Sequence, residues 1–200
     1  NFVQEGLAYR ITPFNTKAPG AKNFDTEKTY NNVMNRFKWG GLDKPGLYID
    51  ETVMRMCYTH RHLFATLAMQ LIAEGQNAKA EKVLRKSEKV LPEYNVPYTF
   101  MSGASDLARA YALIGKKADA SRILNKVWAD AKSYADYYLQ LTGSRFMMSQ
   151  NEVLRQLYIM QNIADMTQAC DKTLADKRLK TVNALYAVYQ AKGGTPYQGE

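Results

Sequence analysis

Two histidines, two positions apart, are the first residues of this sequence whose types suggest chemistry. The segment "THRH" contains His60 and His62, and imidazole is a common metal ligand. The surrounding pattern predicts a helix, in which each residue turns about 100°, so these side chains point roughly 200° away from each other. Unlike the i, i+4 pair of a zinc-binding helix, they do not converge on one ion. We therefore predict no metal site and no cofactor site.

The carboxylates and hydroxyls also have ordinary explanations. Asp50 and Glu51 precede an apolar helical pattern, where acidic groups bind free N–H groups and complement the helix dipole. Asp106 lies one turn before Arg109, which predicts a local ion pair. The segment "GSRFMMSQ" contains Ser144 but no GxSxG turn and no histidine partner. We therefore predict no catalytic residue, and a chain that is not itself an enzyme.

Composition narrows the class of protein. The 200 residues are 46% hydrophobic and 23% charged, which is typical of a globular domain. The net charge of +8 favours anionic surroundings, but the basic residues are scattered through helices, with the densest cluster at 177–180. They are not gathered beside stacking aromatics, so nucleic-acid binding is not predicted. Cys57 and Cys170 lie far apart in apolar patterns, and we interpret both as core thiols.

Hydrophobic periodicity predicts an all-α chain. Residues 1–24 are expected to form an irregular lead-in segment, and residues 193–200 a frayed tail, with no strand anywhere. The expected helices run from Asp25 to Phe37, Asp50 to Glu74, just after Gly75 to Leu91, Pro97 to Ile114, Ala118 to Leu141, Ser149 to about Met166, and Ala169 to Lys192.

An internal repeat appears when Gly75 is aligned with Gly115, forty residues further on. Each copy then reads Leu-Ala-x2-[Leu/Tyr]-x3-Gly-x4-Ala-x3-Leu, with small residues on both sides of the glycine: Ala68 and Ala80 in the first, Ala108 and Ala120 in the second. This pattern resembles the tetratricopeptide repeat, in which two antiparallel helices meet at small residues and turn at a glycine. The resemblance implies a right-handed solenoid of helical hairpins over residues 25–192, as one domain; the alternative is an irregular helical bundle.

The later part of the repeat is weaker. Pro92 lies where the family places its repeat-ending proline, whereas Lys132 occupies that position in the second copy, so the second helix of that copy is expected to run on. A degraded third copy is carried by Leu154, Leu157, Asp165, Cys170 and Leu174, with Asp165 in place of the turn glycine.

An aromatic-rich loop precedes the first repeat. In "NRFKWGGLDKPGLYIDE", Trp39 and other apolar residues surround Gly40 and Gly41, and Pro45 begins a second turn before Asp50 caps the next helix. A solenoid needs a cap over the apolar face of its end repeat. We interpret the loop and the helix before it as such a cap; the alternative is a partner-binding surface.

Helical-repeat proteins bind mainly through the concave face formed by the first helix of each repeat. That position predicts a partner-binding face formed by His62 and Met69 from one repeat and Ser105 and Arg109 from the next. The fourteen tyrosines and two tryptophans are explained by packing between repeats, or by a surface that stacks on sugar rings or holds a peptide. An exposed coplanar aromatic pair would favour sugar, and a mixed polar and methionine groove would favour peptide.

Three segments carry a wider resemblance. They are "EGLAYRITP" at 5–13, "FDTEKTYNNVMNRFKWGGLDKPGLYIDE" at 24–51 and "RHLFATLAMQLIAEGQNAKAEKVL" at 61–84. They resemble the C-terminal soluble region of bacterial multi-pass membrane proteins that are grouped, as a domain of unknown function, with protein O-mannosyltransferase-like glycosyltransferases. The resemblance implies a location on the periplasmic side of the inner membrane. Any transferase activity would belong to the membrane part, which lies outside this sequence.

The expected function is therefore a non-catalytic helical-repeat interaction domain of a membrane-bound glycosyltransferase-like protein. It would act through protein–protein contacts with its own membrane region or with another protein, near the membrane surface. The alternative is a glycan-binding helical-repeat module of an outer-membrane nutrient-uptake system.

Overall fold

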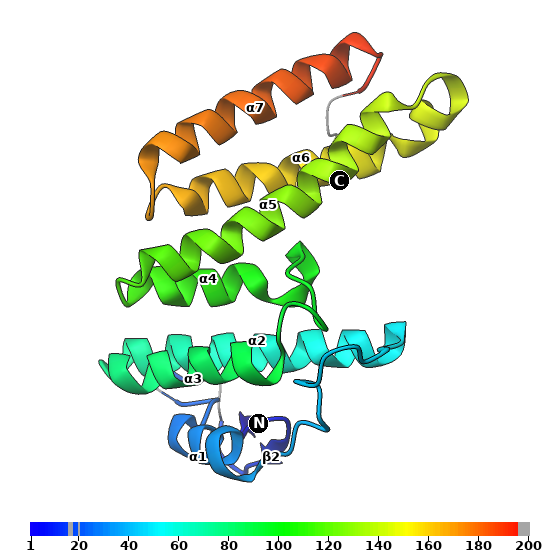
Figure 1. Cartoon of the computed structure of the whole chain (residues 1–200). Coiled ribbons are helices and arrows are strands. Elements are labelled where there is room, and N and C mark those ends of the chain that lie inside the picture. Colours follow the sequence, from blue (N-terminus) through cyan, green and yellow to red (C-terminus); the bar gives the residue numbers. More distant parts are fainter. Residues whose placement is uncertain (16–17, 20, 196–200) are drawn as a thin grey trace. The chain divides into compact units, whose positions relative to one another are not determined.

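The computed structural model describes residues 1–15, 18–19 and 21–195. Helices make up 68% of the structure, so the all-α class is confirmed (Figure 1). The chain divides into two compact units, which are described separately: unit 1 contains residues 1–97 and 101–115, and unit 2 contains residues 98–100 and 116–200. Whether residues 25–192 behave as one domain stays a prediction.

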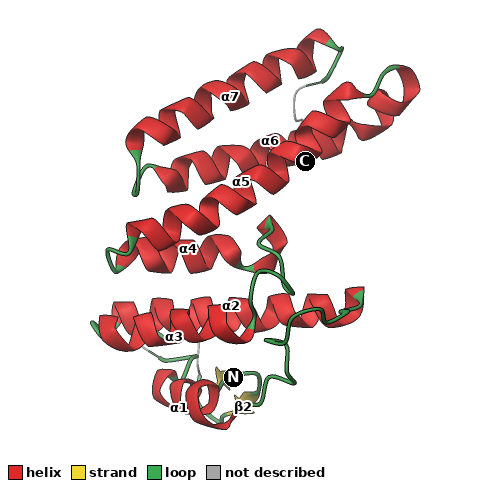
Figure 2. Ribbon diagram, viewed as in Figure 1, coloured by secondary structure: helices red, strands yellow, loops and turns green. Residues whose placement is uncertain are grey.

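The elements follow one another as mostly long helices after a short stranded start (Figure 2). In order they are β1 (Phe2–Gln4), β2 (Tyr9–Ile11), α1 (Thr26–Asn31), the π-helical turn η1 (Asn32–Arg36), α2 (Glu51–Ala73), α3 (Asn77–Val90), the 3₁₀ turn η2 (Phe100–Ser102), α4 (Ala104–Leu113), α5 (Lys117–Gln140), α6 (Gly143–Thr167) and α7 (Lys172–Ala191).

The first hairpin of unit 1 forms as its local signals predict. The Asp50 carboxylate accepts hydrogen bonds from the N–H groups of Thr52 and Val53 at the start of α2. Helices α2 and α3 pack together, and Ala68 and Ala80 are both fully buried, which agrees with their predicted place at the crossing. Gly75 lies in the turn between the two helices. Helix α2 also packs against α4, so it is the central helix of this unit.

The lead-in segment is more ordered than its composition predicts, and the prediction that the chain contains no strand is wrong. Strands β1 and β2 pair antiparallel, with Val3 opposite Arg10. The backbone of Gln4 accepts from the N–H of Asp25 at 2.9 Å and donates to the carbonyl of Asn23 at 2.9 Å, which joins this ribbon to the start of α1. Strands of three residues carry too little periodicity to be recognised in a sequence.

The predicted helix from Asp25 to Phe37 is present as α1 followed by η1. The Asp25 carboxylate accepts from the N–H of Lys28, and so Asp25 caps the start of α1. By contrast, the prediction that Pro97 opens the next helix is wrong. Helix α4 begins at Ala104, seven residues later, and ends before Gly115 as predicted.

Unit 2 consists of three long helices, with α6 packed against both α5 and α7. Its core gathers Leu139 from α5, Phe146, Val153 and Leu157 from α6, and Tyr189 from α7. Helix α5 continues through Lys132 to Gln140, as the absence of a proline predicts. Ala108 and Ala120 are both fully buried, but they belong to different units, so their predicted crossing stays a prediction.

The boundaries of α6 and α7 correct the third repeat. Helix α6 begins at Gly143 rather than Ser149, and Asp165 lies inside it rather than in a turn. The turn comes later, so Cys170 precedes α7, whose first turns bury Ala175 instead. In the described part of the tail, Thr195 accepts from the Tyr189 hydroxyl at 2.8 Å through its carbonyl; residues 196–200 lie outside the description.

Candidate binding face on helices α2 and α4

The structure brings part of the predicted face together within unit 1. His62 from α2 forms an ion pair with Asp106 in the first turn of α4, with Nδ1 and Oδ2 3.2 Å apart. Ser105 is the neighbour of Asp106 in the chain, so the pair places Ser105 close to the crossing. Met69 lies two turns further along α2 and is half-buried, and Arg109 lies one turn further along α4 and is exposed. The face thus presents an imidazole, a guanidinium and a thioether from two packed helices.

Asp106 has a different partner from the one that its spacing predicts. Its carboxylate pairs with His62 of the neighbouring helix instead of Arg109 of its own helix. Helix packing explains the change of partner. Pairing with a side chain that its neighbours already hold in place costs less side-chain entropy than fixing a long, mobile arginine. Arg109 is left directed toward solvent.

The surroundings of His62 favour its charged form. The hydrogen bond to Asp106 raises the pKa of His62 above its ordinary value of 6.5, and a backbone hydrogen bond to Met101 acts in the same direction. Partial burial opposes both. Gly103 lies directly against this side chain, because a Cβ added there would approach the His62 Cγ to 3.1 Å. The imidazole is therefore oriented by its neighbours and offers a cation at the α2–α4 crossing.

A histidine held by a carboxylate also resembles the base and orienting group of a nucleophilic site. The hydroxyl next to it in the chain is that of Ser105, whose Oγ is buried and makes no hydrogen bond to any described residue. A buried hydroxyl without a bond to the imidazole is not an activated nucleophile. The arrangement offers the imidazole of His62 for binding, whereas the buried Ser105 oxygen is not accessible to a ligand on this face.

His60 faces another part of unit 1. Its ring lies edge-on to Trp39, with 5.6 Å between the ring centroids, and burial lowers its pKa. The two histidines of the "THRH" segment thus have different neighbours, as the helix geometry predicts. No group of three histidine, cysteine or carboxylate side chains suited to a metal ion occurs in the described residues.

Arg61, between the two histidines, is a buried, hydrogen-bonded residue whose importance was not predicted from the sequence. It is fully buried, and its guanidinium donates to four backbone carbonyls, those of Leu91, Val96, Pro97 and Ser102. The sequence contains a signal for its burial, since Arg61 lies one turn after Cys57 on the buried face of α2. Its hydrogen bonds fix the segment that leads from α3 to α4, and so position the first turn of α4 against His62.

The aromatic loop covers α2 with only part of its length. The ring of Trp39, which is half-buried, lies over Phe64 with 4.9 Å between the centroids. The Asn95 side chain donates to the carbonyls of Leu42 and Lys44 at 2.7 and 2.6 Å. This first part fits the predicted lid, and both Gly40 and Gly41 have the positive φ that its turn requires.

The second part of the same loop does not cover α2. Leu47 is 42% exposed and Tyr48 is 90% exposed. Within the loop, Trp39 thus makes ring contacts with α2, and whether the loop serves as a lid stays a prediction.

Comparisons of this sequence with protein-family models, with curated proteins and with solved structures found no match. Among the described residues, every helix is too short or too polar to span a bilayer.

Proposed function

We propose that this chain is a non-catalytic, tetratricopeptide-like interaction domain that binds a polypeptide segment on the face formed by His62, Met69, Ser105 and Arg109. The observation that carries the proposal is the His62–Asp106 pair, which joins α2 to α4 within unit 1. Under the proposed repeat pattern, α2 and α4 are the first helices of successive hairpins. In helical-repeat proteins, these first helices form the ligand surface.

The chemistry of the face supports peptide rather than sugar as the ligand. Its accessible groups are the imidazole of His62, the guanidinium of Arg109 and the half-buried thioether of Met69, without an aromatic platform, while the Ser105 oxygen is buried. Arg109 is exposed and suited to a carboxylate, to which a guanidinium donates two parallel hydrogen bonds. Methionine adapts its shape to different apolar side chains. A partner segment with an acidic residue next to an aliphatic one would use both groups.

The wider resemblance supports a parent protein. We propose that the domain belongs to a membrane-bound glycosyltransferase-like protein and lies on the periplasmic side, where it contacts its own membrane region or an acceptor protein. The gene upstream of the codon for Asn1 tests this parentage. A run of hydrophobic spans in the same reading frame is the expected result, and a soluble enzyme or a stop codon there would contradict it.

Peptide selection tests the binding face. Displayed random peptides selected on the immobilised chain should yield binders with a Kd of about 1–100 μM. Their amide shift perturbations should centre on α2 and α4. The variant Arg109→Glu should weaken binding at least about tenfold, which corresponds to roughly 1.4 kcal/mol.

Arg155→Glu supplies the matched control, because it makes the same charge change at another exposed helical arginine, in unit 2. It should leave the affinity unchanged. If both variants weaken binding equally, the effect is one of net charge and the proposed face is wrong. Failure to enrich any peptide would also contradict the proposal.

A further inference from the structure

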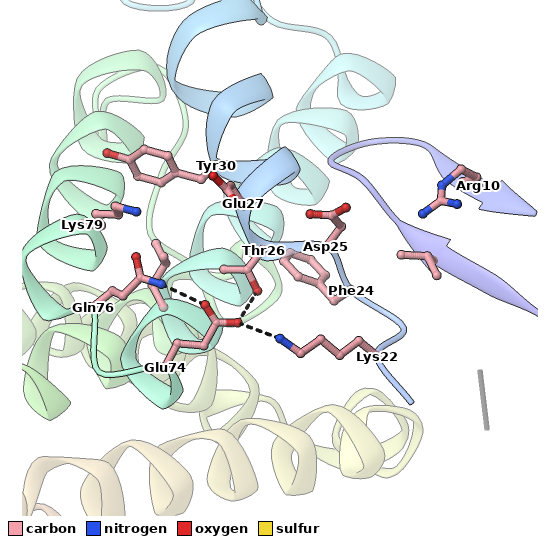
Figure 3. A pocket seen from close by; sticks show the side chains of 12 residues that line it. Arg10, Lys22, Phe24, Asp25, Thr26, Glu27, Tyr30, Glu74, Gln76 and Lys79 are labelled. Carbon is pink, nitrogen blue, oxygen red and sulfur yellow. Dashed lines mark hydrogen bonds and ion pairs between the residues drawn. The ribbon is translucent and has the colours of Figure 1, made fainter. Parts of the chain in front are cut away.

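A second feature of unit 1 lies away from the α2–α4 face. Where the β-ribbon, the start of α1 and the α2–α3 turn come together, the structure has a cavity of about 500 Å³ (Figure 3). This volume lies within the range of small-ligand sites. Three apolar aliphatic or phenyl side chains line it, and all are buried: Val3, Phe24 and Leu71. Most of the other lining residues are polar or charged.

The charged groups of the cavity balance. Three are acidic and three are basic: Asp25, Glu27 and Glu74, with Arg10, Lys22 and Lys79. The two signs are interleaved around the cavity rather than separated into two sides (Figure 3). A site of this kind has no net preference for an anion or a cation.

Glu74, at the C-terminal end of α2, lines the cavity and interacts with three neighbouring side chains. One carboxylate oxygen accepts from the Thr26 hydroxyl at 2.8 Å and lies 3.8 Å from the Lys22 ammonium. The other accepts from the Gln76 side chain at 3.0 Å. Figure 3 shows these three side chains converging on Glu74 from different elements. The carboxylate is therefore held in place while still bordering the cavity.

Other charges of the cavity are engaged in the same way. The Arg10 guanidinium pairs with Glu5 at 2.5 Å, and the Lys79 ammonium lies 5.4 Å from the centre of the Tyr30 ring. These interactions already neutralise part of the charge that an ionic ligand would use. A neutral ligand only needs to add hydrogen bonds to groups that already stand in place, because carboxylates and ammonium groups retain unused acceptor or donor positions.

We propose that this cavity binds a neutral polyhydroxylated ligand, namely a mono- or disaccharide. Each hydroxyl both donates and accepts, so a ring of hydroxyls matches a wall where acceptors and donors alternate. Glu74 and Asp25 accept from the sugar, while Lys79 and Gln76 donate to it. The accessible parts of Val3 and Phe24 contact the C–H side of the ring. This site is separate from the peptide face and does not depend on it.

Titration by NMR of the ¹⁵N-labelled chain tests the proposal. Glucose, mannose, N-acetylglucosamine and maltose are added separately, with glycine betaine as a zwitterion and choline as a cation. At least one sugar should bind saturably with a Kd of about 1 mM, as expected for a small polar ligand. The perturbed amides should be those of residues 22–30 and 74–79. Because the ligand is neutral, affinity should stay constant between low salt and about 1 M salt.

Variants locate the site. Glu74→Gln keeps the size and the hydrogen-bonding reach of the side chain but removes the carboxylate, and should weaken sugar binding at least about fivefold. Lys79→Met, which removes a donor from the cavity, provides a second test and should also weaken sugar binding. Glu152→Gln makes the same change as Glu74→Gln at a partly exposed position of α6 and should have no effect.

Three results would overturn the proposal. They are the absence of binding by all four sugars up to about 50 mM, perturbations outside the cavity, and stronger, salt-sensitive binding of betaine or choline. None of them touches the peptide proposal, since Arg109 does not line this cavity. Conversely, Arg109→Glu should leave sugar binding unchanged.

Discussion

Each unit of the molecule buries an arginine, and the two arginines have different kinds of partner. In unit 1, Arg61 donates to four backbone carbonyls of the segment between α3 and α4. In unit 2, Arg178 of α7 donates to side chains instead: the Thr167 hydroxyl at the end of α6, and the Asn125 amide oxygen of α5 at 2.6 Å. Its guanidinium also lies 4.9 Å from the centre of the Trp128 ring.

The surrounding architecture explains the difference. Unit 1 contains long irregular segments, at 37–49 and 91–97, whose carbonyls have no helix in which to be satisfied. Unit 2 consists of helices joined by short turns, so its backbone groups bond within the helices. Arg61 therefore holds backbone that has no regular structure, whereas Arg178 braces helices that already exist. Burial lowers the pKa of Arg178, and its Nε is buried without a hydrogen-bond partner among the described residues.

Two tryptophans allow the two units to be followed separately. Trp39 belongs to unit 1 and Trp128 to unit 2, and the sequence contains no other. Replacing one of them by phenylalanine leaves a fluorescence signal that reports on the other unit. Separate probes are needed because a chain of two units need not unfold in one cooperative step.

Loss of Arg61 should have the largest effect. Arg61→Met leaves four carbonyls without this donor, three of them in buried hydrogen bonds, and should destabilise unit 1 by about 3–5 kcal/mol. The measurement is urea unfolding followed by Trp39 fluorescence in a Trp128→Phe background. The Trp128 signal, measured in a Trp39→Phe background, should change much less. Equal losses in both signals would show that the two units unfold together.

Loss of Trp39 should rank second, because it removes ring contacts between the other irregular segment of unit 1 and α2. Trp39→Ala should cost about 2–3 kcal/mol, below the 3–5 typical of a fully buried aromatic residue, since Trp39 is only half-buried. Hydrogen exchange of α2 amides provides the measurement. Tyr48→Ala, in the exposed part of the same loop, should cost less than about 0.5 kcal/mol. A Trp39→Ala chain as stable as the Tyr48→Ala chain would refute the lid.

Loss of Arg178 should be milder. In Arg178→Met, the Thr167 hydroxyl keeps its bond to the Ile163 carbonyl, and Asn125 is exposed and turns to water. The expected cost is about 1–2 kcal/mol, mostly from the lost contact with Trp128. Unfolding followed by Trp128 fluorescence in a Trp39→Phe background measures it. A cost as large as that of Arg61→Met would remove the distinction drawn between the units.

The smallest effect should be that of pH on the two histidines of unit 1. Because the pKa of folded His62 is raised, its pair with Asp106 contributes stability that is complete below the unfolded value near 6.5 and disappears as pH rises through the folded pKa. Asp106→Asn should therefore destabilise unit 1 by less than about 1 kcal/mol at low pH, since the pair is half-exposed, and by nothing at high pH. Thermal melts between pH 5 and pH 9 test this.

His60 should behave in the opposite way. Burial lowers its pKa, so the folded state favours the neutral ring. The stability that this ring contributes is present above the unfolded value and is lost as pH falls below it. His60→Gln should therefore make unit 1 less sensitive to acid, whereas Asp106→Asn removes stability in acid. The same sign of pH dependence in both variants would contradict the assignment of the two environments.

Much of the helical framework was predictable from local signals. Asp25 and Asp50 begin their helices as caps, because a carboxylate next to free N–H groups acts within one turn of chain. Ala68 and Ala80 are buried as their size and spacing predict. In each case the determining contact lies within a few residues or within one hairpin.

Only the tertiary structure decided the features that depend on contacts between distant segments. Pro97 has the right geometry to begin a helix, but Arg61, thirty-six residues away, binds its carbonyl, and the helix starts later. The spacing of Asp106 and Arg109 predicted a local ion pair, but Asp106 of α4 pairs with His62 of α2 instead. The cavity beside Glu74 requires the β-ribbon, α1 and the α2–α3 turn to come together. The sequence specifies these residues, but packing decides which donor bonds to which acceptor. Each polar group can form a hydrogen bond with several types of partner, and the fold brings only some of them close to it.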